Sequence, residues 1–349
     1  MQKELPKEPK RTDLVTEGRP TLKTIAFMTG LGVTTVSRAL KDAPDIGADT
    51  KRRVRLVAQQ IGYRPNRAGV RLRTGKTNVI SLILDTDEQL MGFVSDIISG
   101  ISDRLSGSLY HLIVTPYSRT RDPMDPVRYV VETGSADGII FSRTEPNDPR
   151  VRYLTERRFP FVSHGRTDAG IDHPFHDFDN RAYALLAVDK LSELGRQRLS
   201  LLAPPAHLSY HHHTVQGFAE GLAATGASEI PFTDINIDHS IDQIRDRTRA
   251  LLMRPRRPDG FVSSAGAATL AIVAGIEDAG LVLGRDVDVV SKQSAKVLHL
   301  FRPQLHVVNE SFRHAGNELA RTILACIEGQ TTDNVQTLVV PDTVVSPVR

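Results

Sequence analysis

The sequence of 349 residues lacks several features that would place it in a compartment or a membrane. It has one cysteine, Cys326, which cannot form an internal disulfide and suits a reducing compartment. Nowhere do eighteen apolar residues run together, and residues 1–19 contain no apolar stretch typical of a signal peptide. We therefore expect a cytoplasmic protein that has no membrane partner. Residues 1–19 are expected to form a disordered N-terminal tail.

The chain also lacks the short motifs of common enzymes and nucleotide-binding proteins. It has no GxxxxGK[ST] phosphate loop, no GxGxxG at the start of a helix that follows a strand, no GxSxG and no HExxH. These absences predict a protein that is not an enzyme and binds no cofactor. An α/β enzyme stays open as the alternative, and turnover of a bound small molecule would favour it.

Positive charge is concentrated in the first fifth of the chain. Residues 1–78 carry 17 Lys and Arg against 7 Asp and Glu, whereas residues 79–349 carry 27 against 34. A basic segment of this kind raises the local affinity for polyanions, whereas charge that serves only solubility is spread along a chain. The asymmetry favours nucleic acid as a partner, with a solvated basic face as the alternative.

Apolar spacing predicts three short helices in the basic segment. The first covers residues 22–29, with Thr21 as its N-cap and Gly30 as its end. The second covers residues 33–40 after a tight turn, and the third covers residues 49–61. The positions expected to face inward are Leu22, Ile25, Ala26, Thr29, Val33, Val36, Ala39, Leu40, Val54, Val57, Ala58 and Ile61. Two short helices joined by a tight turn and followed by a third form the helix-turn-helix arrangement.

The second of these helices has a polar face suited to DNA. Thr34 and Arg38 lie one turn apart on it, with Thr35 and Ser37 beside them. A helix that enters the major groove needs small polar side chains to approach base edges, and an arginine to reach a guanine or a phosphate. The alternative is an exposed polar face on an ordinary three-helix bundle.

A short basic segment, residues 65–77, follows the three helices. Pro65 ends the third helix, and residues 66–72 are too few to form a stable isolated helix. Leu72 is an apolar residue among arginines, a combination that suits insertion into the minor groove. We expect this segment to fold on binding DNA, with a plain interdomain linker as the alternative.

The run over residues 21–80 resembles the head of the LacI/GalR family of transcriptional regulators. Its most specific parts are "TVSRAL" and "IGYRPN", and the likeness continues more weakly to the C-terminus. The resemblance implies a repressor that binds double-stranded, palindromic operator DNA as a homodimer and responds to a small-molecule effector. The DNA-binding residues that it implies by position are Thr21, Val33, Thr34, Thr35, Ser37, Arg38, Asn66, Arg67 and Leu72.

Several positions of the head depart from the family pattern. Gly32 stands where the recognition helix usually opens with serine, so a side-chain cap is given up. Thr24 replaces the acidic residue usual in the first helix. In the hinge, Gly69-Val70 replaces an Ala-Arg pair, and an interior glycine costs a helix roughly 1 kcal/mol.

The remaining chain alternates apolar runs typical of strands with amphipathic helical runs. Such alternation predicts parallel α/β sheets, and about 260 residues of it exceed one doubly wound sheet, so we expect two lobes. The strand candidates are 79–85, 110–116, 137–142, 159–164, 198–203, 259–264 and 286–290, and helical runs include 93–105, 180–195 and 268–280.

The family resemblance adds boundaries and a fold to this expectation. It implies a small all-α helix-turn-helix head over residues 20–64, joined by a hinge helix and linker to a two-lobed α/β periplasmic-binding-protein-like core over residues 78–349. Chain crossings between the lobes are expected near residues 177–180, 304–308 and 340. The N-lobe would then comprise about 78–177 and 308–340, and the C-lobe about 178–307 and the tail.

Ligands of open α/β sheets bind beyond the carboxyl ends of the strands, so a cleft between two lobes is lined by residues that follow each strand. Phe93 is added by family position, where an aromatic ring commonly packs on the effector. The effector-binding residues proposed on these grounds are Asp85, Phe93, Ser142, Arg166, His213, Ser264, Lys292 and Gln293.

The cleft departs from the family pattern in ways that concern the effector. Thr214 replaces an arginine and Ala265-Gly266 replaces Asn-Asp, while Ser291-Lys292-Gln293 replaces a Gly-aromatic-Asp whose carboxylate often takes sugar hydroxyls. One hypothesis is a sugar-like effector that bears negative charge, such as a sugar acid or sugar phosphate, held by Arg166 and Lys292. The alternative places Lys292 in a structural salt bridge. The sequence has no tryptophan to form a large stacking platform for a sugar.

Two histidine-rich stretches look like metal sites. Successive residues of a helix or strand point in different directions, so His211–His213 cannot easily converge on one ion, and a polar loop lining the cleft is favoured. His173, His176 and Asp177 are read as part of a crossing between lobes. We expect no metal. A solute-binding protein with a nonspecific basic N-terminal segment is a further alternative.

Overall fold

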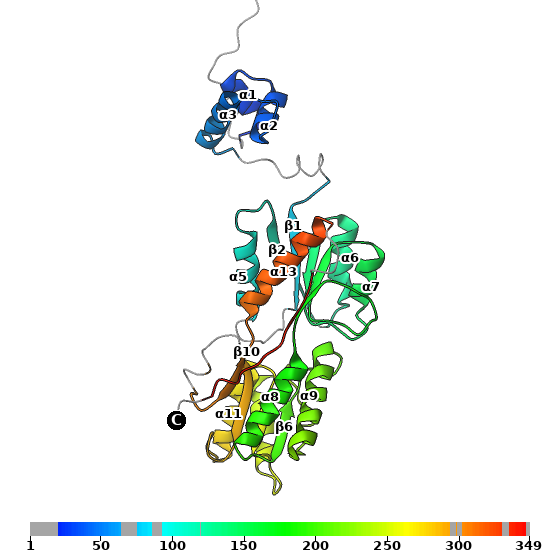
Figure 1. The fold of residues 1–349 in the computed structure, drawn as a ribbon, viewed down its shortest axis with the longest axis vertical. Coiled ribbons are helices and arrows are strands. Elements are labelled where there is room, and N and C mark those ends of the chain that lie inside the picture. The colour runs from blue at the N-terminus through cyan, green and yellow to red at the C-terminus, as the bar shows by residue number, and fades with distance from the viewer. Residues whose placement is uncertain are drawn as a thin grey trace, which may run out of the picture. The chain divides into compact units, whose positions relative to one another are not determined.

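The computed structural model describes residues 20–63, 75–85, 93–118, 120–293, 298, 302–329 and 335–346. The chain divides into two compact units, Met1–Thr77 and Asn78–Arg349 (Figure 1). The predicted hinge helix and the whole of the predicted N-terminal tail lie outside the described residues, and so do Asn66, Arg67 and Leu72. No helix in the described part of the chain has the length and apolar character needed to cross a membrane.

Unit 1 contains three helices, α1 (Leu22–Thr29), α2 (Val33–Leu40) and α3 (Ala48–Gln60). The Thr21 hydroxyl accepts the Thr24 N–H at 3.3 Å, and the Thr24 hydroxyl accepts the Thr21 N–H at 3.1 Å. A reciprocal capping box needs a side-chain acceptor at the third helical position. The Thr24 hydroxyl provides this acceptor in place of the carboxylate of an acidic residue.

The core of unit 1 is small and fully apolar. Ile25, Val36, Ala39 and Val54 are completely buried, and partly buried residues of all three helices pack around them. The inward orientation predicted for Val33 is wrong, because its side chain is 42% exposed. Val33 is the first residue of α2, so the other helices do not cover it.

Unit 2 contains two parallel sheets, each covered on both faces by helices (Figure 1). The first sheet has the order β11-β5-β4-β3-β1-β2. With its helices it forms the N-lobe, in which α5 and α13 share a core on one face and α6 and α7 a core on the other. Its elements are β1 (Val79–Asp85), α5 (Phe93–Leu105), β2 (His111–Tyr117), α6 (Met124–Thr133), β3 (Gly138–Phe141), α7 (Pro149–Glu156), β4 (Phe161–His164), β5 (Phe175–Phe178), α13 (Phe312–Ile327) and β11 (Gln336–Val339).

The second sheet, with the order β10-β9-β8-β6-β7, forms the C-lobe. Helices α8 and α9 share a core on one face, and α10 and α11 share a core on the other. Its elements are α8 (Asn180–Glu193), β6 (Arg198–Leu202), α9 (Ser209–Thr225), β7 (Ser228–Glu229), α10 (Ile241–Leu252), β8 (Gly260–Ser263), α11 (Gly266–Asp278), β9 (Asp288–Gln293) and β10 (His306–Asn309).

The chain runs between the two lobes three times (Figure 1). The first crossing joins β5 to α8, and the second joins β10 to α13. The third follows β11, because Val345 pairs with Val307 of β10 in the C-lobe. The second crossing lies a few residues beyond 304–308, because His306–Asn309 pairs with β9 as an ordinary strand.

The predicted fold class is confirmed. Every strand pairing within the two sheets is parallel, as the alternation of strands and helices indicated. The carboxyl ends of strands from both sheets carry the residues that line one cavity, which is described next.

Candidate functional site

The exposed face of α2 is the first candidate site. Val36 and Ala39 are buried against α1 and α3, so the opposite face of α2 is free. Val33 and Thr34 are exposed at the N-terminal end of α2, and the Arg38 side chain is 53% exposed one turn later. Thr35 and Ser37 are half-buried beside them. Gly32 caps α2 without a side-chain hydrogen bond.

The basic side chains of unit 1 are paired with its own aspartates. Arg38 Nη2 lies 2.6 Å from Asp45 Oδ2, and both side chains are about half exposed. On α3, Lys51 and Arg55 both pair with Asp42, which holds the pKa of that carboxyl below its usual range. The Arg38 and Arg55 side chains are 53% and 51% exposed, and exposed pairs of this kind contribute little and are easily exchanged. Arg38 and Arg55 are therefore available to a phosphate, whereas the Lys51 side chain is only 17% exposed.

A cavity between the two lobes of unit 2 is the second candidate site. It lies beyond the carboxyl ends of β3, β4, β5, β8, β9 and β10, and residues of α5, α9 and α13 complete it. Its lining residues are Phe93, Ser142, Arg143, Thr144, His164, Gly165, Asp177, Asn180, Tyr210, Ser264, Ala265, Gly266, Lys292, Gln293, Leu298, Glu310 and Phe312.

Five of the eight sequence-predicted effector residues line this cavity. They are Phe93, Ser142, Ser264, Lys292 and Gln293. Asp85, Arg166 and His213 are not among the lining residues, although Asp85 and Arg166 contact residues that are. Asp85 and Arg166 thus belong to a layer behind the cavity wall.

Lys292 is held by an internal ion pair. Its Nζ lies 2.9 Å from Glu310 Oε2 and donates a 2.7 Å hydrogen bond to Asn180 Oδ1. The Lys292 ammonium also lies 5.2–5.8 Å from the ring centres of three aromatic residues, Phe178, Tyr183 and Tyr210. The structural salt bridge considered for Lys292 is therefore the arrangement observed.

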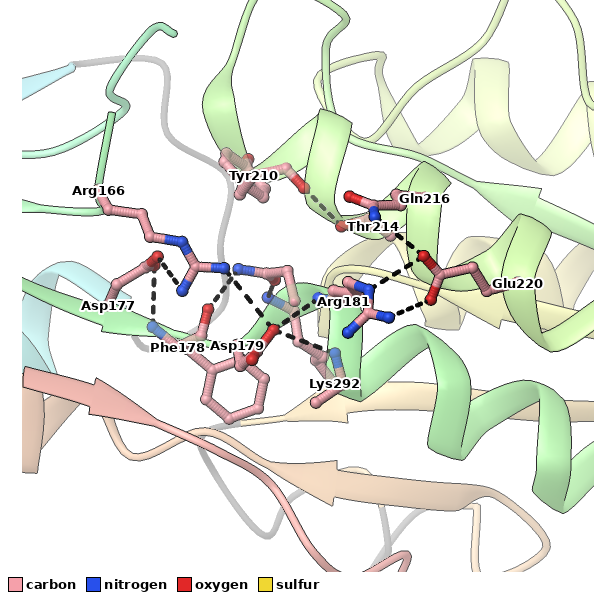
Figure 2. Close-up of polar contacts among 12 residues, drawn as sticks. Arg166, Asp177, Phe178, Asp179, Arg181, Tyr210, Thr214, Gln216, Glu220 and Lys292 are labelled. Carbon is pink, nitrogen blue, oxygen red and sulfur yellow. Dashed lines mark hydrogen bonds and ion pairs between the residues drawn. The ribbon is translucent and has the colours of Figure 1, made fainter. Parts of the chain in front are cut away.

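Arg166 is held in the same way by two carboxylates of the first crossing (Figure 2). Its Nη1 lies 3.3 Å from Asp177 Oδ2, and its Nη2 lies 3.8 Å from Asp179 Oδ1. The hypothesis of an anionic effector needed Arg166 and Lys292 to be without internal partners. Because both are paired within the protein, the reason for an anionic effector no longer holds.

Arg143 bridges the two lobes. Its Nη2 lies 2.6 Å from Asp238 Oδ2 in the loop before α10, and its Nε lies 3.5 Å from Asp85 Oδ2 at the end of β1. The Arg143 backbone has a φ of 56°, a left-handed conformation that is uncommon for a side chain of this size. Beside it, the Ser209 N–H donates a 2.8 Å hydrogen bond to the Thr144 carbonyl, again between lobes.

Three buried polar atoms of the cavity wall have no hydrogen-bond partner among the described residues. They are Ser264 Oγ and Gln293 Oε1 in the C-lobe, and Asp177 Oδ2 in the N-lobe, which is nevertheless ion-paired with Arg166 Nη1 at 3.3 Å. The other end of the Gln293 amide is fixed, because its Nε2 donates to Asn309 Oδ1 at 3.2 Å. Buried polar atoms without partners are costly, so a ligand or a bound water in the cavity would supply the missing bonds.

Aromatic rings form the apolar part of the wall. Phe93 and Phe312 meet edge to face with their ring centres 4.9 Å apart, and His164 packs 5.7 Å from Phe93. Burial lowers the pKa of His164 to about 4, and burial lowers the pKa of its stacked neighbour His176 to about 3. Both imidazoles are therefore neutral at physiological pH and act as aromatic surface.

The pKa of Asp177 is raised to about 7. Burial is the main cause, and the carboxylate of Glu310 adds to it, while the Arg166 guanidinium opposes it. Asp177 is 5% exposed, so its ionised form is poorly solvated. A donor that replaced the missing solvation would favour the ionised form.

The histidine run is not a loop, so that prediction is wrong. His211–His213 belong to the first turns of α9, which begins at Ser209 after a short loop that follows the end of β6 at Leu202. The His211 ring bonds the Pro204 carbonyl at 2.7 Å, and the His212 side chain is exposed. In the described ranges no three His, Cys, Asp or Glu are grouped as metal ligands.

Several residues of the cavity escaped sequence reasoning. Glu310 was missed because the strand before it, His306–Asn309, is only four residues long and was not recognised. Asp177 was read as part of a crossing and not as cavity wall, although it lies at the end of β5. The strand-end rule, applied to β5 and β10, would have found both residues.

Comparisons with known proteins agree on one family. Residues 21–66 match the lacI family of bacterial regulatory proteins, and residues 188–346 match a periplasmic binding protein-like domain. The HTH-type transcriptional regulator AglR of Rhizobium meliloti strain 1021 is 32% identical over 323 residues, which cover 88% of each chain. The HTH-type transcriptional regulator CelR of Thermobifida fusca is 26% identical and covers 91% of this chain and 95% of CelR.

Solved structures share the fold. The lac repressor dimer bound to operator and the anti-inducer ONPF gives a TM-score of 0.82 at 20% identity, covering 94% of this chain and 98% of that one. A CelR–cellobiose complex gives a TM-score of 0.66 at 24% identity, with 94% and 98% coverage.

Proposed function

This chain belongs to the lacI family of bacterial regulatory proteins and is a DNA-binding transcriptional regulator, and from that premise we propose that it represses transcription as a homodimer on a palindromic operator. A small, sugar-like effector in the interlobe cavity controls the affinity for DNA. The relatives AglR and CelR are HTH-type transcriptional regulators, which supports a binding role for the cavity.

The observation that carries this proposal is the division of α2 into two faces. Val36 and Ala39 fix α2 to the core of unit 1, while Val33, Thr34 and Arg38 stay exposed in the pattern that a major-groove helix needs. Thr21, Thr35 and Ser37 are proposed to add contacts to the phosphates or base edges. The proposed contacts of Asn66, Arg67 and Leu72 lie outside the described residues.

The edge of the N-lobe sheet supports a homodimer. The outermost strand β2 carries Ile113 and Val114, which are 48% and 41% exposed, and Leu109 just before it is 77% exposed. Exposed apolar side chains on an edge strand favour burial by a second copy of the chain. Two copies would place two α2 helices on successive major grooves, which is the reason to expect a palindrome.

The class of effector is supported by the cavity and by one relative. The cavity combines aromatic rings with a few convergent polar groups, as small-molecule sites do. The CelR structure is a complex with cellobiose, so a sugar is the class that we propose here. Binding of the effector would change the DNA affinity, and operator DNA would change the effector affinity by the same factor.

Selection of DNA from a random pool by the purified protein, repeated at several salt concentrations, tests this function. We expect a near-palindromic sequence to be enriched at every salt concentration at which binding persists. Uniform binding that disappears as salt rises would instead indicate only nonspecific contact with the basic segment, and would contradict the proposal.

A further inference from the structure

The short loop between α2 and α3 carries two aspartates that pair with different helices. Asp42 pairs with Lys51 and Arg55 of α3. Asp45 pairs with Arg38 of α2, whose Nη2 lies 2.6 Å from Asp45 Oδ2. Within the described residues, Asp45 is the one carboxylate that pairs with Arg38. The exposed arginine of α2 is therefore under the direct influence of a single acidic side chain.

The backbone of this loop holds Asp45 in place. The Ala43 N–H donates to the Arg38 carbonyl at 3.1 Å, and the Ile46 N–H donates to the Ala43 carbonyl at 3.1 Å. Ile46 packs against the core of unit 1, and Pro44 restricts the backbone just before Asp45. The carboxylate is thus presented by a short, hydrogen-bonded turn. Its ion pair limits where the Arg38 guanidinium can lie.

An arginine that already holds a carboxylate distinguishes two kinds of DNA contact. A guanidinium has five N–H donors, so one bond to Asp45 leaves enough of them for two parallel bonds to guanine O6 and N7. Guanine is neutral, so its edge and the carboxylate can share the guanidinium of Arg38. A phosphate is an anion, so Asp45 repels it. Exchange of Asp45 for a phosphate stays possible because the pair is exposed, yet it adds little, since one anion replaces another.

We propose that Asp45 is a positioning residue that makes Arg38 selective for guanine, because it orients the guanidinium toward a base edge and opposes its contact with a phosphate. This inference rests on the proposed function, because it takes α2 as the helix that enters the major groove. Such a residue raises specificity without raising affinity. Its repulsion acts most strongly on DNA that offers Arg38 only phosphates.

Fluorescence anisotropy with the full chain tests this role. The probes are the operator obtained by selection, operators in which each G·C pair of the half-site is replaced in turn by A·T, and a random duplex of equal length. We expect one replacement to weaken binding by the native chain roughly tenfold or more, and Arg38→Ala to remove that penalty. A native chain without such a position, or a penalty that survives in Arg38→Ala, overturns the proposal.

The variant Asp45→Asn provides the sharper measurement, because it removes the charge at nearly constant size. We expect the penalty at that guanine to shrink to less than about threefold. Affinity for the random duplex should rise severalfold, because Arg38 then meets phosphates without a competing anion, while operator affinity changes little. A misfolded head would lose operator binding altogether, so retained binding with a smaller penalty reports on recognition. An unchanged penalty in Asp45→Asn overturns the proposal.

Asp42→Asn is the matched control. It removes one negative charge from the same loop, and asparagine tolerates the left-handed backbone of this position, where φ is 60°. It frees Lys51 and Arg55 but leaves the pair of Arg38 and Asp45 intact. Affinity for the random duplex should rise here too, whereas the guanine penalty should keep its native size. An equal fall of the penalty in both variants would assign the effect to net charge and overturn the proposal.

Failure of this inference is distinguishable from failure of the proposed function. A native chain that selects a palindrome, with the same guanine penalty in Asp45→Asn, refutes only the role of Asp45. A native chain that enriches no sequence refutes the proposed function itself.

Discussion

The ion pairs of unit 1 and those around the interlobe cavity use the same residue types in opposite surroundings. The Arg38 and Asp45 side chains are 53% and 48% exposed, whereas the Lys292 and Glu310 side chains are 9% and 10% exposed. Water screens the first pair, so Arg38 loses little when it exchanges Asp45 for another anion. The second pair is isolated from water, so neither partner can be given up cheaply. Exposure, and not residue type, decides which charges serve a binding partner.

The largest expected effect comes from breaking the buried pair. Lys292→Met leaves Glu310 without its partner in the lobe interface, and we expect unit 2 to lose about 3–5 kcal/mol of unfolding free energy. Urea denaturation followed by circular dichroism measures it. The double variant Lys292→Met/Glu310→Gln removes both charges and should recover most of the loss. A single variant as stable as the native chain would show that the pair is not sealed from water.

The next effect concerns the exposed arginine of α2. Arg38→Ala should weaken binding to the selected operator by about 1–3 kcal/mol, because a side-chain contact to a base edge or phosphate is lost. Fluorescence anisotropy at fixed salt concentration measures this change. The matched control is Arg128→Ala, which removes a similarly exposed arginine from a surface pair in the N-lobe. Equal operator affinity for Arg38→Ala and the native chain would exclude Arg38 from the DNA interface.

A smaller effect is expected from pH. Arg166 and Glu310 are the charged groups that act on Asp177, whose pKa of about 7 lies within the working range. A hydroxyl donor favours the ionised carboxylate, so affinity for a neutral sugar should rise severalfold between pH 6 and pH 8. His164 and His176, with pKa values of about 4 and 3, do not titrate in this interval. Calorimetry across this range should show the rise in the native chain and a weaker one in Asp177→Asn.

The smallest effect is expected from the partner of Arg38. Asp45→Ala removes an exposed carboxylate, and we expect the unfolding free energy of the head to change by no more than about 0.5 kcal/mol. Operator affinity should stay the same or rise, because Arg38 no longer exchanges one anion for another. A marked loss of stability in thermal unfolding would show that this surface pair behaves like the buried pairs of the cavity.

Local signals predicted most of the elements of the fold. Thr21 and Gly30 mark the ends of α1 because an N-cap hydroxyl and a left-handed glycine act through bonds only a few residues away. The alternation of strand-like and helical apolar runs is also a local pattern, and it predicted the two parallel sheets. Val33 was misplaced because helical periodicity does not show which residues at the end of a helix the neighbouring elements leave uncovered.

The charge pairing of the cavity could not be predicted in the same way. Asn180, which accepts a hydrogen bond from Lys292, is 112 residues away in the sequence, and the two meet only because of the order in which the strands cross. Asp238 and Arg143 are separated by 95 residues and belong to different lobes. Sequence reasoning found the cations of the cavity but not their partners, and therefore offered an anionic effector that the internal pairs do not require.

The bridge from Arg143 to Asp238 has a mechanical consequence for the two lobes. The protein itself makes this contact across the lobe boundary, through an arginine side chain that is 7% exposed. Any motion that separates the lobes on this side must break a short, largely buried ion pair, and any motion that brings them together must keep it. The pair therefore biases unit 2 toward one arrangement of its lobes.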